Sequence, residues 1–351
     1  MFKPNYRNMV DCAFNRKPER IPLYDHSVAD VVIEKLTGQE LVKFLIEGDL
    51  DTYFKRYCQF FEKTGYDTVS FEAGVVPLLE GGGALTKHID PAISTMEDLE
   101  KYPFEKIVEK YKKYYTPFLN ALRDNMPEGM KAVGGVGFGV FEVVQDLVGF
   151  ENLCIISFED EELFKEVFIR VGNMMLEIWK FILSNYNDVF CVYRFGDDLG
   201  YRSNTMLTHD QIRINIIPQY KKIISTIKQT GKPFLLHSCG CIFDVMEDLI
   251  AAGINAKHSN EDAIAPFSKW VELYGDRIAN FGGIDTDRIV RGDKEELRKV
   301  TFGVYELAVR KNGGIAIGSG NSIAPYVDPE RYMIMVNTVR KARGDFDSDN
   351  A

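Results

Sequence analysis

Short apolar runs alternate with helical patterns along almost the whole chain. Eight of these runs have the length, the apolar content and the flanking turn residues that are typical of buried strands. They are Arg20–His26, Tyr66–Glu72, Met130–Gly139, Asp188–Asp198, Lys232–Gly240, Ile254–Glu261, Arg277–Asp285 and Gly314–Ser322. From the second run onward, successive runs are separated by enough residues for a crossover helix, so we expect the strands to form a parallel sheet.

Capping residues mark where some of the intervening helices should begin. Thr208 is followed three residues later by Gln211, which is the spacing of a capping box. Residues 328–330 combine an N-cap aspartate, a proline and an early acid. Eight strand–helix repeats predict a single (β/α)8 TIM barrel over residues 1–343, with extra N-terminal and loop helices. Residues 344–351 are expected to form a disordered acidic tail.

Composition narrows the class of protein. The 351 residues include 42 Lys+Arg and 52 Asp+Glu, which gives a net charge of −10, and 45% of the residues are hydrophobic. Disorder over most of the chain is therefore excluded. The acidic balance argues against a nucleic-acid partner or an anionic membrane surface, because both need a concentrated positive surface. The chain contains no apolar run long enough to span a membrane and no recognisable secretory signal, so we expect a cytoplasmic protein.

The ends of the predicted strands are unusually polar. In a barrel of this class the functional site lies at the carboxyl-terminal ends of the strands. The polar ends are Asp25-His26, Glu72, residues 194–198, residues 237–240, residues 258–261, Asp285 and residues 319–322. Carboxylates, histidines and a cysteine on one rim predict a binding or catalytic site.

The most specific local signal is His237-x-Cys239. Residues two apart on a strand face the same side, so the imidazole and the thiol should point to one place. Such a pair suits zinc, and a catalytic zinc commonly has three protein ligands. The alternative is a core histidine beside a core cysteine. Cys241 would extend the motif, but Gly240 should end the strand before it. Four other cysteines are expected to serve only as packing residues: Cys12, Cys58, Cys154 and Cys191.

Several motifs resemble those of the uroporphyrinogen decarboxylase superfamily. They are FGDDLG at the fourth predicted strand, HSCG at the fifth, GGID at the seventh and GSGNSIAPYVDPERY at the eighth. The His-x-Cys pair resembles the zinc-dependent branch, whose methyltransferases move a methyl group between a corrinoid protein and a thiol or folate acceptor. The resemblance implies a zinc cofactor, a corrinoid held by a partner protein and a small-molecule methyl donor or acceptor. No D-x-H-x-x-G segment for binding cobalt occurs in this chain.

Two departures from the family pattern affect the expected function. The decarboxylases carry an arginine-rich segment after the first strand that binds propionate groups, whereas Arg20 is the only arginine of that stretch here. We therefore place methyl transfer first among the possible functions and tetrapyrrole decarboxylation second. A non-catalytic corrinoid or tetrapyrrole binder is the third possibility. Thiol-methylating members also take a cysteine ligand from the strand-eight loop, and alignment on residues 323–325 places Asn321 there.

The missing cysteine leaves the third zinc ligand open. The candidates are Glu261, Asp197, Asp198, Asp285 and Cys241. We favour Glu261 because it ends the strand next to His237-x-Cys239, although it could equally be a helix-terminal acid. We expect Asp197 and Asp198 to have a catalytic role in contact with substrate, with capping of the following turn as the alternative. His258, Asp285 and Asn321 are expected to bind substrate. For His258 the alternatives are a side chain that supports a metal ligand and a histidine that is simply hydrogen-bonded.

Overall fold

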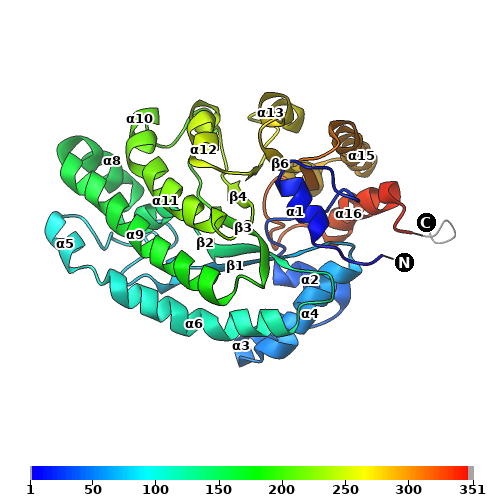
Figure 1. Ribbon diagram of the computed structural model, residues 1–351, viewed down its shortest axis with the longest axis horizontal. Coiled ribbons are helices and arrows are strands. Elements are labelled where there is room, and N and C mark those ends of the chain that lie inside the picture. Colours follow the sequence, from blue (N-terminus) through cyan, green and yellow to red (C-terminus); the bar gives the residue numbers. More distant parts are fainter. Residues whose placement is uncertain (1, 347–351) are drawn as a thin grey trace.

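The computed structural model describes residues 2–346 and contains one seven-stranded parallel sheet surrounded by helices (Figure 1). The strands follow one another in sequence order, and each pairs with the next in parallel. They are β1 (Val69–Gly74), β2 (Ala132–Gly137), β3 (Phe190–Gly196), β4 (Phe234–His237), β5 (Ala256–His258), β6 (Ala279–Ile284) and β7 (Ile315–Ser319). Each of them lies within one of the predicted runs except that β1 extends two residues further.

The structure shows seven strands where eight were expected, because the first predicted run does not form a strand. Leu23 makes only an isolated bridge to Ile317 of β7. The neighbouring Pro22 has no N–H to donate to a ladder, although its carbonyl accepts a hydrogen bond from the backbone N of Ile317 at 3.0 Å. Towards β1, the contact is made by a side chain, since the Ser70 hydroxyl donates to the backbone oxygen of Asp25. This segment therefore lies beside β7 and contacts β1 without completing a regular barrel strand.

Helices surround the sheet, and most of them cover its outside (Figure 1). They are α1 (Arg7–Ala13), α2 (Asp30–Thr37), α3 (Val42–Glu47), α4 (Leu50–Lys63), α5 (Met96–Lys101), α6 (Phe104–Asp124), α7 (Val140–Val148), α8 (Phe150–Glu159), α9 (Glu161–Asn185), α10 (His209–Gln211), α11 (Ile217–Lys228), α12 (Met246–Ala252), α13 (Phe267–Tyr274), α14 (Thr286–Arg291), α15 (Lys294–Lys311) and α16 (Pro329–Arg343), with short turns η1 (Val76–Leu78), η2 (Ile212–Ile216) and η3 (Phe243–Val245). The expected extra helices are α1–α4 before β1, α5 before α6 and α7–α8 before α9. The predicted capping box at Thr208 and the N-cap at Asp328 are both confirmed.

The core has two parts, one inside the curled sheet and one between the sheet and the helices. Met9 and Cys12 of α1 belong to the inner apolar cluster, together with Val133, Leu235 and Phe281 of the strands. Every residue of β2 to β7 is buried. Polar side chains are therefore available mainly where the strands end.

Two further expectations from the sequence concern membrane-spanning segments and the C-terminal tail. No helix within residues 2–346 is long and apolar enough to cross a membrane. Of the expected acidic tail, residues 347–351 lie outside the described part of the chain. Gly344 ends α16 in a left-handed conformation, and the Asp345 carboxylate pairs with Arg343.

Close packing of β2 against β1 leads to a stability prediction at Gly134. Its φ is +154°, and a Cβ atom there would lie 1.7 Å from the backbone oxygen of Phe71. We expect Gly134→Ala to lower the free energy of unfolding by about 3 kcal/mol or more, because the two strands must separate to accept the methyl group. Gly303→Ala is the matched control, since nothing lies within 4 Å of that position in α15. It should stabilise the protein by about 0.5–1 kcal/mol. Equal unfolding midpoints in urea for the two variants would contradict this prediction.

Candidate functional site

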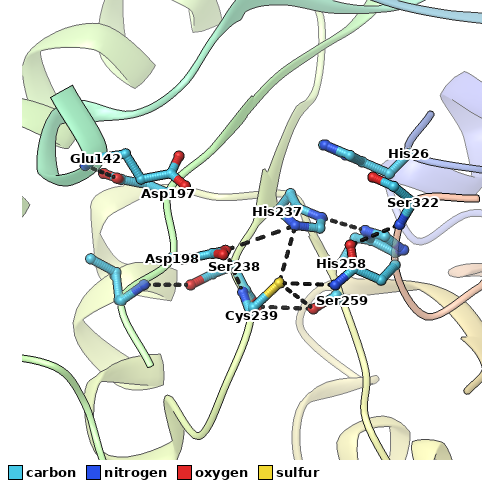
Figure 2. Close-up of polar contacts among 12 residues, drawn as sticks. His26, Glu142, Asp197, Asp198, His237, Ser238, Cys239, His258, Ser259 and Ser322 are labelled. Atoms are coloured by element: carbon cyan, nitrogen blue, oxygen red, sulfur yellow. Dashed lines mark hydrogen bonds and ion pairs between the residues drawn. The ribbon is translucent and has the colours of Figure 1, made fainter. Parts of the chain in front are cut away.

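The carboxyl-terminal ends of β3, β4 and β5 bring a histidine, a cysteine and a carboxylate together (Figure 2). The register pairs Gly196 with His237 and His237 with His258, so these strands end at the same level. Asp198 follows β3, and Cys239 follows β4 after one intervening residue. Because neighbouring parallel strands end at one edge, side chains from separate parts of the sequence meet there.

The distances among three of these side chains fit a tetrahedral metal. Nε2 of His237 lies 3.4 Å from Sγ of Cys239 and 3.8 Å from Oδ1 of Asp198. The three ligand atoms all lie within 4.8 Å of one another. Zinc bond lengths of about 2.0–2.3 Å place tetrahedral ligands roughly 3.3–3.6 Å apart, so small movements would complete the geometry. The Asp198 side chain is 42% exposed, which leaves solvent access to this group.

A second cluster of possible donors is formed by His26, His237 and His258, but its geometry does not suit a metal. Nδ1 of His237 lies 2.7 Å from Nδ1 of His258, whereas two nitrogens on one zinc lie roughly 3.3 Å apart. The His26 ring stacks on the His237 ring, with centroids 3.9 Å apart and an angle of 27° between the planes. His258 therefore forms a hydrogen bond with His237, and His26 packs against the His237 ring.

Burial sets the protonation states at this site. It lowers the pKa of His237 well below the ordinary value and lowers the pKa of His258 to about 3, so both rings are neutral at pH 7. A neutral imidazole is the form that binds a metal. Burial also disfavours the charged form of the Cys239 thiol and therefore raises its pKa. Its sulfur lies near two hydrogen-bond donors, Asn321 Nδ2 at 3.3 Å and Ser259 Oγ at 3.6 Å, and such donors favour the thiolate.

The structure corrects the expected role of Asp197. Its side chain is completely buried, so it offers no surface to a substrate. The carboxylate accepts hydrogen bonds from the backbone N of Phe141 at 2.9 Å and of Glu142 at 2.8 Å, in the first turn of α7. It also accepts a hydrogen bond from the Tyr220 hydroxyl at 2.5 Å. Asp197 therefore satisfies free N–H groups at the N-terminus of α7, whereas the alternative expected from the sequence was a cap for the turn that follows it.

Other predicted residues are distributed between the site and the surrounding fold. Asn321 lies at the site, next to Cys239. Asp285 caps α14 and also accepts a hydrogen bond from the backbone N of Asp262 at 2.6 Å. Neither Glu261 nor Cys241 belongs to the group of donors that lie within 4.8 Å of one another, whereas Asp198, another of the candidates, does.

The contacts of His258 differ from the expected contact with substrate. The ring is completely buried, and it is bonded to His237 on one side and to the backbone oxygen of Ser319 on the other. His258 is thus placed to orient another side chain.

Two further side chains near the site were not assigned a role from the sequence. Glu142 lies in the first turn of α7, and burial together with the charges of Asp197 and Asp198 raises its pKa well above the ordinary value. Arg194 is buried inside the sheet, where its Nε donates to Glu72 at 2.6 Å and its guanidinium also donates to the Tyr24 hydroxyl at 2.7 Å. The signal for Glu142 was its place directly after a predicted strand, where functional residues of a barrel gather.

Comparison with known proteins agrees with this architecture. Residues 55–342 match the family model for uroporphyrinogen decarboxylase (URO-D), so the chain belongs to the uroporphyrinogen decarboxylase family. A solved methyltransferase from Methanosarcina mazei aligns over 97% of this chain and 99% of that chain, with 15% identity and a TM-score of 0.72, which shows a shared fold. A D-psicose 3-epimerase structure aligns over 84% of this chain and 93% of that chain, with 11% identity and a TM-score of 0.37, too low to support an inference. No curated sequence matches the chain significantly.

Proposed function

We propose that this protein is a methyltransferase that moves a methyl group between a corrinoid held by a partner protein and a thiol or folate acceptor. The observation that carries the proposal is the convergence of His237 Nε2, Cys239 Sγ and Asp198 Oδ1 at the strand ends. This mixed nitrogen, sulfur and oxygen donor set suits zinc. When bound, zinc would supply the Lewis acidity that keeps an acceptor thiol in its reactive thiolate form.

The side chains around this donor set have distinct tasks in the proposed reaction. His237, Cys239 and Asp198 would hold the metal, with Asp198 in place of Glu261. Asn321 donates a hydrogen bond to the Cys239 sulfur and so limits the basicity of the thiolate. Glu142, whose pKa burial raises well above the ordinary value, lies at the same rim and would exchange a proton with the acceptor.

The charges at the site favour methyl transfer over decarboxylation of a tetrapyrrole. The one buried arginine beside the site, Arg194, is already paired with Glu72. The exposed Asp198 adds an acidic group at the same rim. A porphyrinogen carries many carboxylates, which the Asp198 carboxylate would repel. We therefore prefer a methyltransferase to a decarboxylase, and also to a binder without catalysis.

A metal analysis combined with two activity assays tests the proposal. The protein is purified without added metal, its zinc content is measured, and methylcobalamin is supplied with a simple thiol or a folate. We expect close to one zinc per chain and an absorbance change as methylcobalamin loses its methyl group. Conversion of uroporphyrinogen to coproporphyrinogen by zinc-free protein would establish the decarboxylase instead. Corrinoid binding without turnover on any acceptor would support the binder.

The position of Asn321 gives a spectroscopic prediction. Its Nδ2 lies 3.3 Å from Cys239 Sγ, which is close to the separation of two ligands on one metal. In the cobalt(II)-substituted protein, we expect Asn321→Cys to increase the sulfur-to-cobalt charge-transfer absorbance roughly twofold, because a second thiolate joins the metal. Asn321→Ser is the control and should leave the absorbance unchanged. An unchanged spectrum for Asn321→Cys would place the metal away from this pair.

A further inference from the structure

We propose that His258 is a positioning residue that, together with the backbone carbonyl of Ser319, holds His237 in the one tautomer able to bind a metal through Nε2. The inference rests on the metal site proposed above. It concerns a property of the chain itself, however, that can be observed in the metal-free protein.

The hydrogen-bond partners determine where each proton lies. Nε2 of His258 is 2.9 Å from the backbone oxygen of Ser319, and a carbonyl oxygen can only accept. His258 Nε2 must therefore carry the proton. The His258 ring is completely buried and contacts no carboxylate, so it is neutral and its Nδ1 is a bare acceptor. Nδ1 of His237, 2.7 Å away, must then donate to it.

The consequence appears at the other nitrogen of His237. With the proton on Nδ1, Nε2 has a free lone pair, and this is the atom that faces Cys239 Sγ at 3.4 Å and Asp198 Oδ1 at 3.8 Å (Figure 2). The other tautomer of His237 would set two bare Nδ1 atoms against each other, or would force His258 Nε2 to face the Ser319 carbonyl without a proton. Both arrangements leave buried polar atoms unpaired.

Neighbouring elements hold His237, His258 and the Ser319 carbonyl in the positions that these hydrogen bonds need. The pairing of β4 with β5 places His237 directly beside His258. Ser319 is the last residue of β7, and both its backbone N and its hydroxyl donate to Oδ1 of Asp25, at 2.9 and 2.6 Å. The His26 ring stacks on His237 from the opposite side. The tautomer is thus fixed by parts of four chain segments.

Nitrogen NMR of histidine-labelled, metal-free protein tests the inference directly. Two-bond 1H–15N correlations distinguish protonated from bare ring nitrogens. We expect His237 to be protonated at Nδ1 and His258 at Nε2, without any zinc, corrinoid or substrate present. A proton on Nε2 of His237 in the metal-free wild type would overturn the inference, whether or not the protein proves to be a methyltransferase. A failed methyl-transfer assay, in turn, would leave this NMR result unaffected.

Substitutions at His258 provide the second readout. His258→Phe removes the acceptor, so we expect His237 to lose its fixed tautomer and zinc affinity to fall about 10–100-fold. His258→Gln keeps an acceptor oxygen for His237 and an N–H donor for Ser319, so its affinity should stay close to the wild-type value. His209→Phe, at an exposed histidine paired with Asp248, is the control and should change nothing. Equal losses in His258→Phe and His258→Gln, with the His237 tautomer unchanged in both, would overturn the inference.

Discussion

Cys239→Ser should abolish tight zinc binding and methyl transfer together. Cys239 supplies the one sulfur among the three convergent donor atoms, and a serine hydroxyl is a much weaker ligand for zinc. Loss of an outer partner of a metal ligand already costs about 10–100-fold in affinity, so loss of the ligand itself should cost at least about a hundredfold. Competition with a chromophoric chelator measures the affinity, and the methylcobalamin assay measures the activity.

Cys241→Ser is the matched control for this experiment. Cys241 lies only two residues further along the chain and is also half-buried, but it is outside the group of convergent donors. We expect Cys241→Ser to retain the wild-type zinc content and rate. If Cys241→Ser lost the metal while Cys239→Ser kept it, the site would have to be rebuilt around the other cysteine.

Asp197→Ala should be among the most destabilising substitutions in the protein. The buried carboxylate accepts hydrogen bonds from the backbone N of Phe141 and Glu142 and from the Tyr220 hydroxyl. Alanine would leave these buried donors without a partner and would create a cavity at the start of α7. We expect the free energy of unfolding to fall by about 3–5 kcal/mol, measured by urea denaturation.

Asp98→Ala provides the comparison for Asp197→Ala. Asp98 also pairs with a helix N-terminus, as part of the Thr95 capping box of α5, but it does so at the surface. Its loss should cost about 1 kcal/mol, because water can replace the lost partner. Similar costs for the two variants would show that the Asp197 carboxylate is less important to the fold than its contacts indicate.

Much of the fold could be predicted from the sequence because its signals are local. Apolar runs bounded by turn residues identified the regions of all seven strands, and the spacing of Thr208 and Gln211 identified a helix start. The segment at residues 20–26 shows the limit of such reasoning. Its composition is that of a strand, but ladder pairing depends on whether both neighbours offer matching backbone groups, and β1 offers a serine side chain instead.

From the sequence alone, the period of two along a strand predicted that His237 and Cys239 would point to one place. In the structure β4 ends at His237, but Nε2 of His237 and Sγ of Cys239 do lie 3.4 Å apart. Only the tertiary structure decided the roles of the adjacent Asp197 and Asp198. One carboxylate turns inward to a helix whose first turn lies 55 and 56 residues earlier in the chain, and the other faces His237 across neighbouring strands. The same applies to the candidates for a third donor, because only the structure shows that Asp198, and not Glu261, lies close to His237 and Cys239. Contacts between residues so far apart in sequence depend on strand register and helix placement, which no local pattern encodes.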